Sequence, residues 1–401
     1  MISQEQDDSR LFRYYPGDFG ALTVKVIHMD LVFDLYDQYT RAISRLTAEV
    51  LDSPVKDLAL NAHDLEILSV SCDGVAVTTE YDRNRAKLTL RFDPELAPHT
   101  RFTVRTESIC RPSDHILEGL YYDRTPEGAP PTQITQCQQW GFQRIVPCID
   151  DMTAKCTYTT TIIADERYSS LLSNGDVAIP RHPAGPGRVS ITYDNTLTPM
   201  APYLFFLCAG TFDTHTRELE YPDGHRITLE LLVPPGSDPA VADYALGVLA
   251  DAILWVYLFT GRGSYEQIDE KEKISTLIRE RDRLKEEGVD PEILEEVRTR
   301  LRKMAAEITP GYRYTGTVYR EIGMQNSDFG GMENVGNTTI TMNRIMPYPQ
   351  MTDPAFEYMI RVKVHEFYHN LNGSEVTGKT PFELWLNEAV TAFMENKYHS
   401  R

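Results

Sequence analysis

The chain has 401 residues, with 59 acidic and 40 basic side chains and a formal net charge of −19. This length suits two or three domains, and the acidic balance argues against nucleic-acid binding because no basic stripe is available to neutralise phosphates. No run of eighteen apolar residues occurs, and residues 1–15 lack the apolar core of a signal peptide. We predict a soluble protein with neither nucleic acid nor membrane as a partner.

Six cysteines are spread along the chain without the paired spacing of a metal site or the density of a disulfide framework. We therefore expect reduced thiols and a cytoplasmic protein. The cysteines are Cys72, Cys110, Cys137, Cys148, Cys156 and Cys208.

From about residue 19 to residue 212, short alternating or β-branched runs are separated by turn residues such as Asp73-Gly74 and Asn174-Gly175. This pattern predicts an antiparallel β domain over residues 1–215. The runs lie at residues 22–33, 65–71, 75–81, 86–92, 101–109, 156–163 and 189–193.

Residues 216–401 have a different pattern, which begins with a predicted strand at 227–233 and a predicted helix at 239–260. Residues 264–309 are then rich in Glu, Lys and Arg. Apolar residues at helical spacing on both sides of Gly288 predict two amphipathic helices in a hairpin inserted into this domain. For this hairpin we favour a solvated structural insertion over a partner-binding arm.

The strongest motif is His365-Glu366-Phe367-Tyr368-His369. Positions i and i+4 lie on one face of a helix, so both imidazoles can point at a single metal ion. The pair Asp353-Pro354 predicts the helix start, with Asp353 as the cap, and Asn372-Gly373 predicts its end, which places both histidines mid-helix. Glu366 is rotated about 100° from His365 and is the candidate base that takes a proton from water.

A second helix is predicted to begin at Thr380-Pro381-Phe382-Glu383, which combines a capping box with a first-turn proline. Eighteen residues separate Glu388, in this helix, from His369. Two imidazoles and one carboxylate leave a fourth position open for water, which is typical of a catalytic zinc site. We predict one Zn²⁺ per chain, bound by His365, His369 and Glu388.

Two weaker motifs lie upstream of the histidines. The run Gly330-Gly331-Met332-Glu333-Asn334 precedes a β-branched stretch at 338–342, and glycines let a ligand backbone come close because they lack a Cβ. The run Thr135-Gln136-Cys137-Gln138 offers two amides. Alone, the first motif is usually only a turn and the second only polar surface.

Together and in this order, these motifs and the stretch Arg144-Ile-Val-Pro147-Cys148-Ile-Asp150 resemble the zinc aminopeptidase family of aminopeptidase N and leukotriene hydrolase. The resemblance covers nearly the whole chain and is weakest before residue 110 and in the hairpin. It implies an α+β protein in which a saddle-like antiparallel β domain precedes a thermolysin-like, mainly helical zinc catalytic domain, apparently incomplete.

The resemblance also implies the substrate, a peptide with a free N-terminus. In the family, the matching residues bind the substrate's α-amino group, and they fall here on Glu333 and Gln138, with Gln136 lining the same site. The rest of the substrate-binding motif falls on Gly330, Gly331, Met332 and Asn334.

Three positions depart from the family pattern: Gly331 replaces a usual alanine, Met152 a common proline, and Ala389 a frequent glycine. The family's tyrosine that supports the oxyanion lies well beyond the third zinc ligand, and Tyr398 is too close to Glu388 to take that role. We therefore expect a fragment of a longer protein that folds and binds zinc, has at most weak activity, and exposes an apolar surface near its end.

The leading hypothesis is a zinc metalloaminopeptidase. One alternative is a bifunctional epoxide hydrolase of the leukotriene type, because Gln136-Cys137-Gln138 resembles that branch. Another is a noncatalytic interaction protein that uses the 264–309 hairpin on a peptidase scaffold. The intact set His365, Glu366, His369 and Glu388 argues against this last hypothesis.

Overall fold

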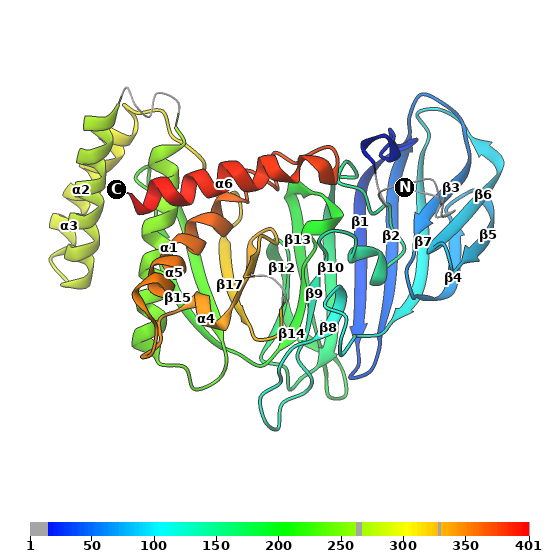
Figure 1. The fold of residues 1–401 in the computed structure, drawn as a ribbon, viewed down its shortest axis with the longest axis horizontal. Coiled ribbons are helices and arrows are strands. Elements are labelled where there is room, and N and C mark those ends of the chain that lie inside the picture. Colours follow the sequence, from blue (N-terminus) through cyan, green and yellow to red (C-terminus); the bar gives the residue numbers. More distant parts are fainter. Residues whose placement is uncertain (1–14, 262–266, 328–329, 401) are drawn as a thin grey trace.

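The computed structural model describes residues 15–261, 267–327 and 330–400. A β region comes first, and a region in which helices pack on a mixed sheet follows it (Figure 1). The predicted α+β class, with an N-terminal β domain before a helical domain, is therefore confirmed.

The largest sheet has seven strands in the order β12-β13-β10-β1-β2-β7-β4. Neighbours are antiparallel except β1 and β10, which run parallel from the pair His28 and Thr157 to the pair Asp34 and Ile163. A parallel pair needs a long connection, and β1 and β10 are far apart in the chain, so no local turn signal reveals it. The strands are β1 (Val24–Leu35), β2 (Thr40–Val50), β4 (Glu66–Cys72), β7 (Arg101–Cys110), β10 (Cys156–Asp165), β12 (Asp176–Gly185) and β13 (Arg188–Met200).

Two smaller sheets complete the β region, one in the order β3-β6-β5 and the other in the order β11-β14-β9-β8. Buried residues alternate with partly buried or exposed ones in β7 and with partly buried ones in β10, as expected for strands with one face on a core. The strands are β3 (Val55–Asn61), β5 (Ala76–Asp82), β6 (Lys87–Leu96), β8 (Gly119–Tyr122), β9 (Gln133–Gln136), β11 (Ser170–Ser173) and β14 (Leu207–Gly210).

The second region is built on a five-stranded sheet in the order β15-β16-β17-β19-β18, with β18 at one edge. Strand β14 pairs within the β region, whereas β15 pairs within this second sheet. The predicted domain division between residues 215 and 216 falls inside β15, and it stays a prediction. Sequence patterns indicated β16 and β19 but missed the others. The strands are β15 (Asp213–Glu220), β16 (Arg226–Val233), β17 (Val318–Met324), β18 (Gly331–Met332) and β19 (Asn337–Thr341).

Helices α1 (Pro239–Phe259), α4 (Met342–Ile345), α5 (Asp353–Tyr368) and α6 (Leu384–His399) pack on or beside this sheet. By length and composition alone α1 is also suited to cross a membrane, but more than half of its most apolar 18-residue stretch is buried in the protein. The predicted hairpin is present as α2 (Ile268–Glu286) and α3 (Pro291–Ala305). Buried Arg281 anchors it by donating to the Glu220 carbonyl at 2.7 Å, and a partner role for the hairpin stays a prediction.

The two regions share an apolar cluster. Side chains from the β8–β9–β14–β11 sheet meet Leu232 of β16 and Ile322 of β17. This contact fixes the β region against the sheet that carries the candidate site. The contributing side chains of the small sheet and its surroundings are Tyr121, Ile134, Leu172, Phe206 and Cys208.

A buried carboxyl lies in the β region, within the stretch that resembles the zinc aminopeptidases. Asp150 is 2% exposed, and its carboxylate accepts the backbone N–H of Gln143 at 3.1 Å. Asn61 approaches the backbone N–H of Asp150 at 3.4 Å and the Gln143 side chain at 3.3 Å. Burial raises the pKa of Asp150 to about 8, because a low-dielectric environment disfavours the charged form.

This raised pKa makes the stability of the protein dependent on pH. Between the ordinary aspartate pKa and about 8, the folded state keeps a proton at Asp150 that the unfolded state releases, so stability falls as pH rises. Asp150→Asn keeps an acceptor for Gln143 and removes the titration. Chemical unfolding at pH 5 and pH 8 should therefore show the wild type losing more stability than the variant, by on the order of a few kcal/mol. Equal losses would contradict a neutral Asp150.

Candidate active site

Helix α5 carries the histidine motif; its cap lies one residue before the predicted Asp353, and the helix ends about three residues before the predicted stop at Asn372-Gly373. The N-cap is Thr352, so Asp353 is the first helical residue rather than the cap. His369 is the C-cap residue rather than a mid-helix residue. Its φ of −60° and ψ of −21° are still helical, so the i, i+4 relation to His365 is kept. Beyond His369 the chain continues in turns, in which the N–H groups of Asn370 and Leu371 donate to the carbonyls of Phe367 and Tyr368, and sequence patterns do not separate such turns from the last helical turn.

The three predicted metal ligands converge. The Nε2 atoms of His365 and His369 are 3.1 Å apart, and the Glu388 carboxylate lies 3.3 Å from the first and 3.8 Å from the second. Among the described residues this is the only set of three His, Cys, Asp or Glu side chains whose ligand atoms converge this way. Two nitrogens bound to one zinc at about 2.0–2.1 Å must lie within about 4.2 Å of each other, so the spacing fits zinc.

The outer nitrogens of both histidines are already occupied. His369 Nδ1 lies 2.9 Å from the Asn372 carbonyl, which can only accept, so that nitrogen carries the proton. In the neutral ring, His369 Nε2 then presents a lone pair to the centre of the site. His365 Nδ1 is 3.0 Å from Glu395, which orients its Nε2 in the same way. The donor set therefore suits a cation between the rings.

The charges around the histidines favour a cation as well. Burial would lower the pKa of His365, but its hydrogen bonds with Glu388 and Glu395 outweigh burial and raise the pKa to about 11. The same hydrogen bond to His365 lowers the pKa of Glu388. Glu388 thus stays an anion, while the side-chain exposure of 46% leaves it open to the solvent side.

Glu366 lies beside this set and is 5% exposed. Burial raises the pKa of Glu366 to about 8; the His365 charge opposes this effect, and the Glu333 and Glu388 charges add to it. A carboxyl group whose pKa is shifted toward neutral pH is suited to take and return a proton. A Cβ at Gly331 would come within 2.2 Å of the Glu366 carboxylate, so the glycine at this departure from the family pattern allows the close approach.

The predicted substrate-binding residues lie on two different sheets. Gly331 and Met332 form the edge strand β18, and Glu333 follows it, 4% exposed, with one carboxylate oxygen that has no hydrogen-bond partner among the described residues. Asn334 is buried and donates to the Asn337 carbonyl at 3.4 Å, so it shapes the turn before β19.

Gln136 ends β9, and Gln138 follows it in the loop. The Gln136 amide nitrogen is buried without a partner among the described residues, so it is available to an acceptor on a ligand. Gln138 is partly exposed. In the part of the chain that the structure describes, no hydrogen bond links either glutamine to the histidines or to Glu333, so their shared role stays a prediction.

Comparisons with known proteins agree with this geometry. Residues 25–204 match the peptidase M1 N-terminal domain, and residues 294–401 match the peptidase family M1 domain. The chain belongs to the M1 peptidase family. The aminopeptidase N of Caulobacter vibrioides is 26% identical over 95% of this chain, and that of Escherichia coli 26% over 96%; the chain spans 37% of the length of each.

Two further comparisons extend the M1 assignment. The leukotriene A-4 hydrolase of Xenopus laevis is 22% identical over 96% of this chain and 53% of its own length. A crystal structure of Legionella pneumophila aminopeptidase A superposes on 95% of this chain and 38% of that chain, with a TM-score of 0.72 and 22% identity. At that identity the superposition shows the shared fold alone.

Sequence reasoning missed several residues that hold this M1 site in place. Glu395 accepts from Arg361 at 2.7 Å while it orients His365. It lies seven residues after Glu388, or two turns along α6, and that spacing was a usable signal. Tyr203, from the β region, donates to the Gly373 carbonyl at 3.1 Å, and no sequence signal pointed to it.

Tyr398 takes no part in the site. Its hydroxyl donates to Asp251 of α1 at 2.7 Å, and its ring packs against Trp255. This position agrees with the prediction that Tyr398 does not support the oxyanion.

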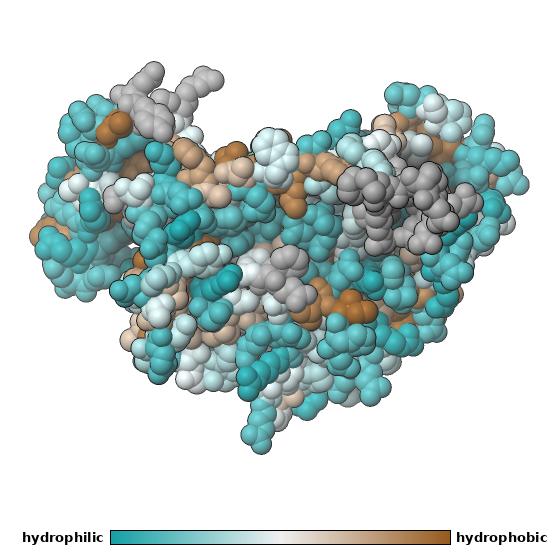
Figure 2. Space-filling view, in the orientation of Figure 1, coloured by the Kyte–Doolittle hydropathy of each residue, from teal (hydrophilic) through white to brown (hydrophobic). Residues whose placement is uncertain are grey.

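The outward face of α6 and the turn before it are apolar, as expected for an exposed surface near the end of this sequence. The apolar patch lies along α6 at the upper edge of the molecule in Figure 2. Adjacent exposed apolar side chains of this kind are typical of contact surfaces. Its exposed side chains are Phe382, Trp385, Leu386, Val390 and Phe393.

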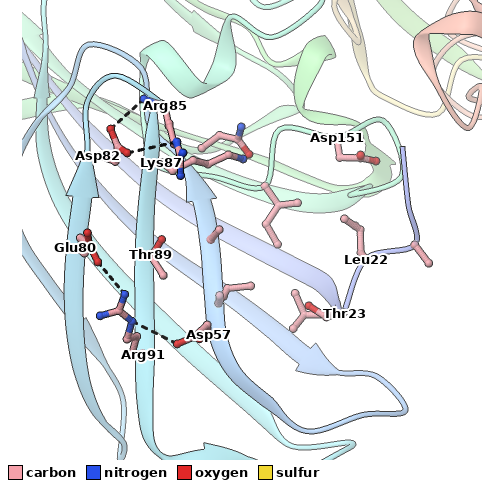
Figure 3. Close-up of a pocket in the computed structure, with 16 residues that line it drawn as sticks. Leu22, Thr23, Asp57, Glu80, Asp82, Arg85, Lys87, Thr89, Arg91 and Asp151 are labelled. Atoms are coloured by element: carbon pink, nitrogen blue, oxygen red, sulfur yellow. Dashed lines mark hydrogen bonds and ion pairs between the residues drawn. The ribbon is translucent and has the colours of Figure 1, made fainter. Parts of the chain in front are cut away.

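A cavity of about 560 Å³ lies elsewhere, beside the β3-β6-β5 sheet (Figure 3). None of its lining residues belongs to the candidate site. Five of its charged side chains pair with one another, since Arg91 lies between Asp57 and Glu80, and Arg85 contacts Asp82. Among the described residues, metal-ligand atoms converge at the candidate site and not at this cavity, so convergent polar groups, rather than cavity size, identify the site in this chain.

The hydrogen bond between Glu395 and His365 predicts a measurable loss of metal binding. Glu395→Ala should weaken zinc binding by about 10- to 100-fold, because carboxylates that orient a ligating histidine contribute at this level. Competition with a chelator gives the affinity, with exposed Glu296→Ala as the control and His369→Ala as the reference for complete loss. An unchanged affinity in Glu395→Ala would show that the contact does not orient His365.

Proposed function

We propose that the chain carries the metal centre of a zinc metalloaminopeptidase, which removes N-terminal residues from peptides. The convergence of His365, His369 and Glu388 beside buried Glu366 carries this proposal. The aminopeptidases among its M1 relatives support the reaction class, and the chain spans only 37% of the aminopeptidase N relatives.

His365, His369 and Glu388 would hold the zinc ion, which when bound supplies a Lewis acid that polarises the peptide carbonyl and makes water more acidic. Glu366 accepts the proton of the attacking water and returns it to the leaving amine. Its buried position raises its pKa toward neutrality, which suits both transfers. Glu395 and the Asn372 carbonyl keep the two imidazoles oriented throughout.

Glu333 supplies the preference for a free N-terminus. Its buried carboxylate has one oxygen without a hydrogen-bond partner in the described structure, and it lies close enough to Glu366 to affect the pKa of Glu366. An ammonium group leaving water for such a site needs an anionic partner, and Glu333 provides it. An internal peptide bond carries no ammonium group, so this arrangement favours cleavage at the chain end.

Glu366 is expected to be required for turnover and dispensable for metal. In the full-length native polypeptide, Glu366→Gln should retain its zinc while hydrolysis of aminoacyl anilides falls by about two to four orders of magnitude, the usual range for a lost general base. Zinc content by elemental analysis and steady-state rates are measured on the same samples. Wild-type turnover in the variant would mean that another group is the base, and wild-type protein that cannot be loaded with zinc would remove the proposed function.

Glu333 is expected to discriminate between free and blocked N-termini. Glu333→Ala should raise KM and lower kcat for free-amine substrates, because the ammonium then loses its partner in a buried site. N-acetylated substrates should be poor for the wild type and change little in the variant. Equal cleavage of acetylated and free peptides by the wild type would instead indicate an endopeptidase.

A further inference from the structure

Arg344 is a cation at the edge of the candidate site that the mechanism above does not use. It lies on α4, directly after β19, and is partly buried. Its guanidinium lies 4.6 Å from the centre of the Tyr358 ring of α5. It also lies against Gly330, where a Cβ would approach its Nη1 atom to 1.8 Å. Gly330 therefore makes room for this guanidinium beside β18.

Arg344 has no carboxylate partner among the described residues. Its one polar side-chain contact is the Tyr358 hydroxyl, at the long distance of 3.5 Å. By contrast, Arg361 of helix α5 is paired with both Glu357 and Glu395. In a chain with net charge −19, a half-buried guanidinium that is stacked on an aromatic ring, with no anion beside it in the described part of the chain, is suited to bind an anionic ligand.

The residues around β18 indicate in which orientation a peptide substrate would lie in the site. Glu333, after the strand, is the proposed partner of the substrate ammonium. Gly331 contacts Glu366, the proposed base, and Gly330 contacts Arg344. A substrate with its amino group at Glu333 and its scissile bond at Glu366 therefore has its leaving portion beside Arg344.

The distance between Arg344 and Glu366 is compatible with this orientation of the substrate. From the two glycine contacts and standard backbone dimensions, the Arg344 guanidinium and the Glu366 carboxylate lie no more than about 11 Å apart. An extended peptide covers about 3.3–3.6 Å per residue, so this interval holds at most about three residues.

We propose that Arg344 determines specificity by binding a substrate carboxylate within about three residues after the scissile bond. The carboxylate is either an Asp or Glu side chain or the C-terminal carboxylate of a short peptide. This inference rests on the proposed aminopeptidase function, because that function sets the orientation of the substrate.

Binding to protein that cannot cleave its ligand tests the proposal directly. Zinc-loaded Glu366→Gln protein is titrated by calorimetry with Ala-Ala-Ala and with its C-terminal amide, and with Ala-Asp-Ala amide and Ala-Asn-Ala amide. At least one carboxylate peptide should bind about 10- to 100-fold more tightly than its uncharged match, as expected for a charge-assisted hydrogen bond. The pair that shows the difference identifies which carboxylate is bound.

Adding Arg344→Met should abolish that difference, whereas Arg344→Lys should keep part of it because the charge remains. Arg83→Met, which removes an exposed charge from the β region, is the control and should change nothing. A difference that persists in Arg344→Met, or no difference in the parent protein, overturns the proposal. Aminoacyl anilides carry no carboxylate, so their turnover by the wild type tests the aminopeptidase function separately.

Discussion

Two imidazole nitrogens face each other at 3.1 Å in this protein, with a carboxylate within 3.8 Å of both. His365, whose pKa is raised to about 11, can donate a proton to His369 across this distance, and a metal ion can take the place of that proton. The surrounding structure holds the two rings in position. It does so through the Asn372 carbonyl behind one ring and Glu395 behind the other. Asn372 also donates to the Asn387 carbonyl at 2.9 Å, which ties the end of α5 to the helix that carries Glu388.

A buried ion pair links helix α5 to strand β17 of the sheet on which it packs. Lys363 is 0% exposed and contacts Glu321 of β17, whose side chain is 1% exposed. Such a pair contributes little net stability, but separating the partners leaves a buried charge, so a shift of the helix that breaks this contact is costly. Tyr319 of β17 packs edge-on against Phe367 beside it. The motif residues thus project from a helix whose position on the sheet is fixed.

The β region contributes to the same site from the opposite side. Lys155 donates to the carbonyls of Ser374 and Glu375, and Tyr203 donates to that of Gly373. All three acceptors lie in the turn that connects α5 to the second ligand helix. Residues of the β region therefore help to hold the turn between the two helices that carry the candidate metal ligands.

The sequence by itself determined the parts of the protein that depend on local spacing. The i, i+4 histidines, the capping box at Thr380 and the alternation in β7 follow from helix and strand periodicity, and the structure reproduces them. Only the tertiary structure decided the parallel pairing of β1 with β10, the roles of Tyr203 and Glu395, and the place of Arg344 against Gly330. Each of these brings together residues from different elements, and the backbone dihedral preferences that make spacing informative act within one element only.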